Sequence, residues 1–239
     1  MGGLLHVWEA ARTLRTNVYI DGFNLYYALK STCFKWLDLG QLCKLMLPKS
    51  TINRLRYFTA RVVPRPGNPG QLQRQDLYLR ALATIPHLSV HLGTFLSNPK
   101  DVVTADSPPN HPRFVRIIHT EEKGSDVNLA TYLLLDGFRG DYEVAVVISN
   151  DSDLTEPIRV VRDELKLPIG VLCPHDNPSW QLRKAATFWR EIRDATLAKA
   201  QFGDVLTDAH GEFHKPTRWN SGATVRPSRK RAGRGKPVR

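Results

Sequence analysis

The sequence is poor in cysteine and contains no long apolar run. Its three cysteines, Cys33, Cys43 and Cys173, form no CxxC pair, which favours free thiols in a reducing compartment over a disulfide scaffold. No apolar run approaches the roughly 18–20 residues that a membrane-spanning helix needs. The start, MGGLLHVWEAARTLRT, is too mixed in charge for a signal peptide. We therefore expect a cytoplasmic protein without a membrane partner.

Acidic residues are missing from the C-terminal end of the chain. After Glu212 come nine Lys and Arg residues and no acid, which leaves 25 cations against 23 acids upstream. The end of the predicted extension (201–239) is rich in Arg, Gly and Pro, so we predict a disordered basic tail. Such a tail either attracts nucleic acid phosphates through counterion release or only keeps the chain in solution.

Strand and helix patterns alternate along the chain, which predicts an α/β domain with a mainly parallel sheet covered on both faces. The pattern predicts strands over 17–21, 54–63, 88–95, 113–119, 143–150 and 168–173. It predicts helices over 24–31, 38–47, 70–85, 125–138, 155–166 and 179–200. A Pro-, Asn- and Asp-rich stretch, 97–112, is typical of a loop.

Carboxylates follow three of these predicted elements. Asp21 ends the first strand, Asp151 and Asp153 follow the 143–150 strand, and Asp126 lies in the first turn of the 125–138 helix. Ligands of open α/β sheets bind at the carboxyl ends of the strands, so we expect these acids at one rim. Like charges repel, and a hard cation such as Mg²⁺ or Mn²⁺ with oxygen ligands would relieve that repulsion.

Each acid also has a purely structural interpretation. Asp126 and Asp153 suit the starts of helices, where an acid contributes roughly 1 kcal/mol, and Asp21 suits a turn before Gly22. One other site is a weaker alternative. His210 and His214 have a zinc-compatible spacing without an evident third ligand, in a segment that we predict to be loop-like.

Three motifs, in this order and spacing, resemble those of the NYN domain family, closest to its bacterial LabA-like members. The motifs are YIDGFN, EEKGSDVNLA and VVISNDSDL, and the resemblance covers roughly residues 16–190. It implies a Rossmann-like, three-layer α/β/α, PIN-like fold over 16–200 and a ribonuclease that depends on Mg²⁺ or Mn²⁺. Single-stranded RNA is the partner that the resemblance implies. The oligomeric state stays open, with a homodimer as one option.

The same resemblance implies the site residues. The family's acids fall on Asp21, Asp126, Asp151 and Asp153 as the catalytic set, with the first three as metal ligands. We also expect Asn24, Lys123 and Asn150 to contact the substrate; the first two match polar residues of the family's motifs.

The sequence departs from the family pattern beside the paired acids. Asn150 stands where many members have Gly, and Pro157 comes four rather than three residues after Asp153. Metal binding by Asp153 is therefore less expected than binding by the other three acids.

Two alternative functions remain. DSDLT also fits the phosphatase pattern in which the first Asp attacks phosphorus, and a non-catalytic module could bind RNA or a protein through the same rim.

Overall fold

The computed structural model describes residues 13–63, 67–104 and 113–221. Its centre is a seven-stranded sheet in the order β4-β3-β2-β1-β5-β6-β7, in which every neighbouring pair is parallel except β3 and β4. The strands are β1 (Leu14–Asp21), β2 (Ser50–Ala60), β3 (Leu88–Val103), β4 (Phe114–Lys123), β5 (Val144–Ile148), β6 (Ile169–Cys173) and β7 (Phe188–Glu191). The predicted mainly parallel sheet is confirmed.

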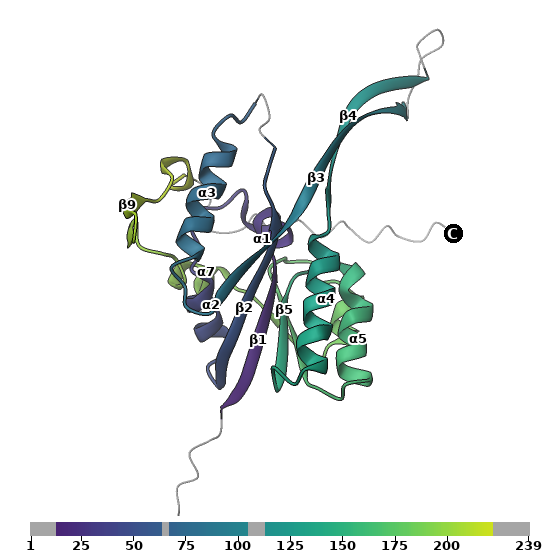
Figure 1. Cartoon of the computed structure of the whole chain (residues 1–239), viewed down its shortest axis with the longest axis vertical. Coiled ribbons are helices and arrows are strands. Elements are labelled where there is room, and N and C mark those ends of the chain that lie inside the picture. Colours follow the sequence, from purple (N-terminus) through teal and green to yellow (C-terminus); the bar gives the residue numbers. More distant parts are fainter. Residues whose placement is uncertain (1–12, 64–66, 105–112, 222–239) are drawn as a thin grey trace, which may run out of the picture.

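Helices cover both faces of the sheet (Figure 1). They are α1 (Gly22–Leu29), α2 (Leu39–Met46), α3 (Gln71–Leu82), α4 (Ser125–Phe138), α5 (Thr155–Asp163), α6 (Trp180–Ala185) and α7 (Asp194–Lys199). Successive side chains of a strand point to opposite faces, so Val18 and Ile20 pack in the core with α1, α2, α3 and α7. Tyr19 packs in the second core with α4, α5 and α6. This is the predicted three-layer α/β/α fold.

The strand order reverses at β1. The chain runs from β1 outward through β2 and β3, and later returns to the other side of β1 with β5. The crevice at such a reversal, outside the carboxyl ends of the strands, is where open α/β sheets bind ligands. Asp21 is the last residue of β1, and Asp151 follows β5 after two residues, so the fold puts both acids at this crevice.

The predicted loop over 97–112 is partly wrong. Its first residues continue β3 to Val103 and pair with β4 in an antiparallel ribbon, and residues 105–112 lie outside the described chain. Beyond Gly93, β3 no longer pairs with β2. An edge position of this kind tolerates Pro99, so the loop-like composition did not prevent a strand.

The predicted helix over 179–200 is wrong as one element. It divides into α6, β7 and α7, because residues 188–191 pair with β6 and extend the sheet. The Thr187 amide fixes this pairing by donating to the Ile169 carbonyl at 2.8 Å. Here tertiary pairing prevails over a helix-compatible apolar pattern.

The predicted loop around HGEFH is also wrong. Strands β8 (Val205–Asp208) and β9 (Gly211–His214) form an antiparallel hairpin. A short 3-10 helix, η2 (Thr217–Trp219), follows. Phe213 and Trp219 are buried against Trp36 in the core beside α2 and α3.

The basic tail, from residue 222 onward, lies outside the described residues. Among the described helices, none is long and apolar enough to cross a bilayer.

Candidate metal centre

Three of the four predicted acids meet at the rim of the sheet. Asp21, Asp126 and Asp151 each offer one carboxylate oxygen, and these three oxygens lie within 4.8 Å of one another. Asp21 is buried, whereas the other two side chains are half-buried and face the cavity described below. Three carboxylates at this separation can share one hard cation.

Asp21 is held by two hydrogen bonds that leave it facing the crevice. Its Oδ1 accepts from the Asn24 amide at 2.9 Å, which caps α1, and its Oδ2 accepts from Ser149 Oγ at 2.8 Å. The residue after it must be glycine, because a Cβ at Gly22 would lie 2.6 Å from the Tyr57 ring and 2.7 Å from the Phe58 carbonyl oxygen. The sharp turn expected at Gly22 is therefore tied to close packing on β2.

Asp151 begins a short 3-10 helix, η1 (Ser152–Leu154), and caps it by accepting the Asp153 amide at 3.1 Å. Its own amide donates to Ser149 Oγ at 3.0 Å. Asp153 is exposed and lies outside the three-carboxylate cluster, although its charge reaches Asp126. The structure thus separates the paired acids, and a catalytic part for Asp153 stays a prediction.

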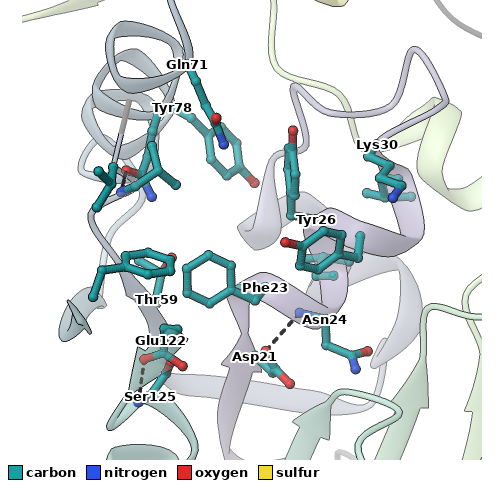
Figure 2. Close-up of a pocket in the computed structure, with 18 of the residues that line it drawn as sticks. Asp21, Phe23, Asn24, Tyr26, Lys30, Thr59, Gln71, Tyr78, Glu122 and Ser125 are labelled. Atoms are coloured by element: carbon teal, nitrogen blue, oxygen red, sulfur yellow. Dashed lines mark hydrogen bonds between the residues drawn. The ribbon is translucent and has the colours of Figure 1, made fainter. Parts of the chain in front are cut away.

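Asp126 reaches the rim although β4 runs against the rest of the sheet. The β3–β4 ribbon extends past the ends of the parallel strands, so β4 returns to the rim at Lys123 and α4 starts there. Gly124 makes this turn with a φ of 98°, in the left-handed region that favours glycine. Glu122 Oε1 then accepts the Ser125 amide at 3.0 Å and secures the first turn of α4 (Figure 2).

The cluster carries unfavourable electrostatics without a cation. Burial raises the pKa of Asp21, and the charges of Asp151 and Glu122 raise it further. Burial, followed by the charges of Asp21 and Asp151, raises the pKa of Asp126 to about 6. A divalent ion would remove this repulsion by favouring the ionised carboxylates.

The three polar residues predicted to contact substrate lie in different surroundings. Asn24 lines the cavity, and its Oδ1 accepts the Asn150 amide at 3.0 Å. The Asn150 side chain holds the loop after β6, donating to the Asn177 carbonyl at 2.9 Å and accepting the Ser179 amide at 2.6 Å. Lys123 Nζ donates to Glu121 Oε1 at 2.7 Å instead of pointing into the cavity. Substrate contacts by these residues stay predictions.

The acid cluster lies at one end of a cavity of about 1400 Å³. Figure 2 shows Tyr26 and Lys30 on one side of it, Gln71 and Tyr78 on the other, and Phe23 above Asp21. The Tyr26 and Tyr27 rings are 38% and 55% exposed, so flat apolar surfaces are available beside the acids. The cavity combines aromatic walls with carboxylates at its end.

The cations expected to attract a nucleic acid backbone are less available than the sequence suggests. Arg61 pairs with Asp76, and Arg80 pairs with Asp208. Arg74 lines the cavity and donates to Asn68 Oδ1, and Arg65 lies outside the described residues.

Comparison with known proteins identifies the family. Residues 15–191 match the NYN domain. The chain belongs to the NYN domain family. NYN domains are typically PIN-like nucleases, which agrees with the α/β/α layers and with the carboxylates at the rim.

A curated relative and a solved structure are among the proteins that resemble this NYN domain. It is 31% identical over 236 residues to a protein of Pseudomonas putida (strain DSM 28022 / S16) named 6-hydroxy-3-succinoylpyridine 3-monooxygenase HspA, covering 86% of this chain and 75% of that protein. A crystal structure of VPA0982 from Vibrio parahaemolyticus RIMD 2210633, a protein of unknown function, shares 16% identity with a TM-score of 0.48, covering 80% of this chain and 97% of that one.

The residues of this NYN domain fit a hard divalent cation. The cluster provides only carboxylate oxygens, the donors that Mg²⁺ and Mn²⁺ prefer. Two residues that support it, Ser149 and Glu122, were not predicted from the sequence. Glu122 stands four residues before Asp126 in the EEKGSD motif, which could have indicated it. Ser149 carries no comparable signal, because a buried serine after a strand is common.

Proposed function

We propose that this NYN domain is a metal-dependent ribonuclease that hydrolyses phosphodiester bonds of single-stranded RNA in the cytoplasm. The observation that carries the proposal is the cluster of Asp21, Asp126 and Asp151, with three oxygens within 4.8 Å at the end of the cavity. Membership of a nuclease family supports the same reaction class.

The three carboxylates would hold one or two Mg²⁺ or Mn²⁺ ions. Bound there, such an ion lowers the pKa of a water molecule and polarises the scissile phosphate. The chain's own contribution is orientation. Ser149 and Asn24 fix both oxygens of Asp21, and the Ser149 hydroxyl also fixes the backbone at Asp151. We expect in-line attack by water and products with 5′-phosphate and 3′-hydroxyl ends.

The cavity favours an unpaired strand. Tyr26 and Tyr27 offer exposed rings on which bases can stack, and Lys30 Nζ lies 5.2 Å from the centre of the Tyr27 ring. Stacking on aromatic rings recognises single strands with little sequence preference. In a duplex the bases already stack on one another, so their faces are not available to these two rings.

The name of the Pseudomonas putida relative suggests a different reaction, hydroxylation of a pyridine ring. The cluster favours hydrolysis, because non-haem iron oxygenases combine two histidines with one carboxylate, whereas the three ligands here are all carboxylates. A flavin- or nicotinamide-linked monooxygenase would consume oxygen and a reductant, so direct measurement separates the two functions.

The test is cleavage of an end-labelled single-stranded RNA with Mn²⁺, Mg²⁺ or EDTA. We would compare wild type with Asp151→Asn, which keeps the shape of the side chain and removes its charge. Asp153→Asn is the matched control variant, because Asp153 lies outside the cluster. We expect metal-dependent cutting by wild type, loss of cutting and of Mn²⁺ binding in Asp151→Asn, and retained Mn²⁺ binding in Asp153→Asn.

Two results would contradict the proposal. One is RNA that is bound but left intact with every metal, which favours the non-catalytic binding module. The other is oxygen uptake with 6-hydroxy-3-succinoylpyridine and a reduced nicotinamide or flavin, without RNA cleavage, which favours the reaction named for the relative.

A further inference from the structure

A two-stranded arm extends from the three-layer body. It consists of residues 94–103 of β3 and Phe114–Lys123 of β4, and Figure 1 shows it projecting beyond the helices. Beyond Gly93, β2 no longer pairs with β3, so the arm has only two strands. Two-stranded ribbons are at best marginally stable in water unless a third strand or another surface covers them.

Both faces of the arm carry exposed apolar side chains. Residues directly opposite each other in an antiparallel ribbon share a face. Val103 pairs with Phe114 on the face that also carries Ile118, and the three are 59%, 57% and 69% exposed. The other face carries Leu96 and Val115, which are 51% and 42% exposed. Contiguous apolar patches of this kind mark interaction sites.

The charges of the arm do not suit a nucleic acid. Its three cations are balanced by three acids: Lys100, Arg116 and Lys123 against Asp101, Glu121 and Glu122. Lys123 already pairs with Glu121 at 2.7 Å. A phosphate backbone would gain little from a neutral ribbon, so the occupant of the arm is a protein surface.

The outer edge of the arm is suited to a second copy of itself. β4 is the edge strand of the sheet, and its ten residues contain neither Pro nor Gly. Such an edge presents unpaired N–H and C=O groups. Two copies related by a twofold axis perpendicular to the sheet would join their β4 edges in the antiparallel direction and close the assembly.

The order of charges along β4 favours this antiparallel arrangement. Arg116 lies in the first half of the strand, and Glu121 and Glu122 stand near its end, before Lys123, which pairs with Glu121. Antiparallel pairing brings Arg116 toward the acidic end of the other copy, whereas parallel pairing brings like charges together. We propose that the chain forms a homodimer in which the β4 edges of two arms pair antiparallel, so that the apolar side chains on each face lie beside those of the second copy.

The dimer would also support the cavity. Phe95, Ile118 and Thr120 belong to the arm and line the same cavity as the acid cluster. A second arm beside them would hold this wall in place. The dimer itself does not depend on the proposed ribonuclease function, because it rests on the arm alone.

The experiment is light scattering after size exclusion, over a range of concentrations. We expect wild type at twice the chain mass of 27.1 kDa. Ile118→Glu on one face, Val115→Glu on the other and Arg116→Glu at the charge contact should each weaken the dimer, the first by at least about 100-fold. The control is Phe138→Glu at the end of α4, which is 69% exposed like Ile118 and should remain dimeric.

Hydrogen exchange of wild type provides a readout that needs no variant. Amides of residues 114–120 should become more protected as the concentration rises through the dimer range. A wild-type mass of 27.1 kDa at about 100 µM would overturn the proposal. So would arm variants that stay dimeric, dissociation by Phe138→Glu, or arm amides whose exchange is independent of concentration.

Discussion

The Ser149 hydroxyl donates a 2.8 Å hydrogen bond to Asp21 Oδ2 from a fully buried position. Ser149 Oγ also accepts a hydrogen bond from the Asp151 amide at 3.0 Å, so this one side chain connects the ends of β1 and β5. Groups that orient metal ligands typically change metal affinity by about 10–100-fold when they are removed. We therefore expect Ser149→Ala to weaken Mn²⁺ binding by about tenfold. RNA cleavage should fall with it, and excess metal should partly restore the cleavage.

The matched control is Ser152→Ala, at an exposed serine three residues later at the start of η1. Isothermal titration with Mn²⁺ measures the affinity of both variants. RNA cleavage at rising Mn²⁺ concentration shows whether excess metal restores the activity of Ser149→Ala. Equal affinities in Ser149→Ala and wild type would show that this hydroxyl does not orient the cluster.

The raised pKa of Asp126, about 6, makes the stability of the metal-free protein depend on pH. An unfolded aspartate titrates near 3.9, so between about pH 4 and 6 the folded state holds a proton that the unfolded state has lost. The free energy of unfolding must then fall as pH rises through this window. Because Asp126 is half exposed, we expect about 1–2 kcal/mol rather than the full effect of the pKa shift.

Thermal unfolding in EDTA from pH 4 to 7 measures this effect, and Asp126→Asn isolates it from other carboxylates. The difference in stability between the two proteins should change with pH in this window and then level off. Adding Mn²⁺ at pH 7 should stabilise wild type by mass action and leave Asp126→Asn nearly unchanged. A difference that stays constant across the pH range would contradict the raised pKa.

The positions of Asp21 and Asp151 could be predicted because each follows from a local signal. An apolar strand ends at an acid, and the carboxyl ends of parallel strands share one rim. This reasoning needed no knowledge of the arm, although Asp126 reaches the rim only because β4 turns back along β3.

The arm and the C-terminal hairpin could not be predicted, because both depend on contacts between distant residues. Pro99 made β3 look like a loop, and only the edge position explains why a strand tolerates it. The segment around Phe213 has no strong local pattern, and its fold depends on a place beside Trp36, far earlier in the chain. Asp153 shows the same limit, since a spacing of two residues does not reveal that its side chain is outside the cluster.

Substitution of Tyr27 tests the proposed binding of single-stranded RNA in the cavity. Its ring is 55% exposed and lies 5.7 Å from the Tyr26 ring, centre to centre. Stacking of one base on an aromatic ring contributes about 1–3 kcal/mol. In an Asp151→Asn background with EDTA, which prevents cutting, we expect Tyr27→Ala to weaken binding of single-stranded RNA by about 5–150-fold.

Fluorescence anisotropy with a labelled oligonucleotide measures this binding. Trp180→Ala is the control, because Trp180 is 69% exposed on α6 and does not line the cavity. A similar loss in both variants would mean that RNA binds exposed aromatics without regard to the cavity.

Trp219 tests whether the segment after residue 200 is an extension or part of the folded domain. Its ring is 7% exposed and lies 6.0 Å from Trp36 and 5.8 Å from Tyr78, centre to centre. Tyr78 belongs to α3 and lines the cavity, so the C-terminal segment supports a wall of the site. Removing a buried tryptophan side chain typically costs about 3–5 kcal/mol.

We expect Trp219→Ala to lower the melting temperature by roughly 6–20 °C for a domain of this size. Val205→Ala, at an exposed residue of the preceding β8–β9 hairpin, should have little effect. A chain truncated after residue 200 loses Phe213 together with Trp219 and leaves Trp36 partly uncovered, so it should be less stable than the single variant. If Trp219→Ala and the truncated chain both melt like wild type, the segment is an appendage, and the domain ends near residue 200 as the sequence alone indicates.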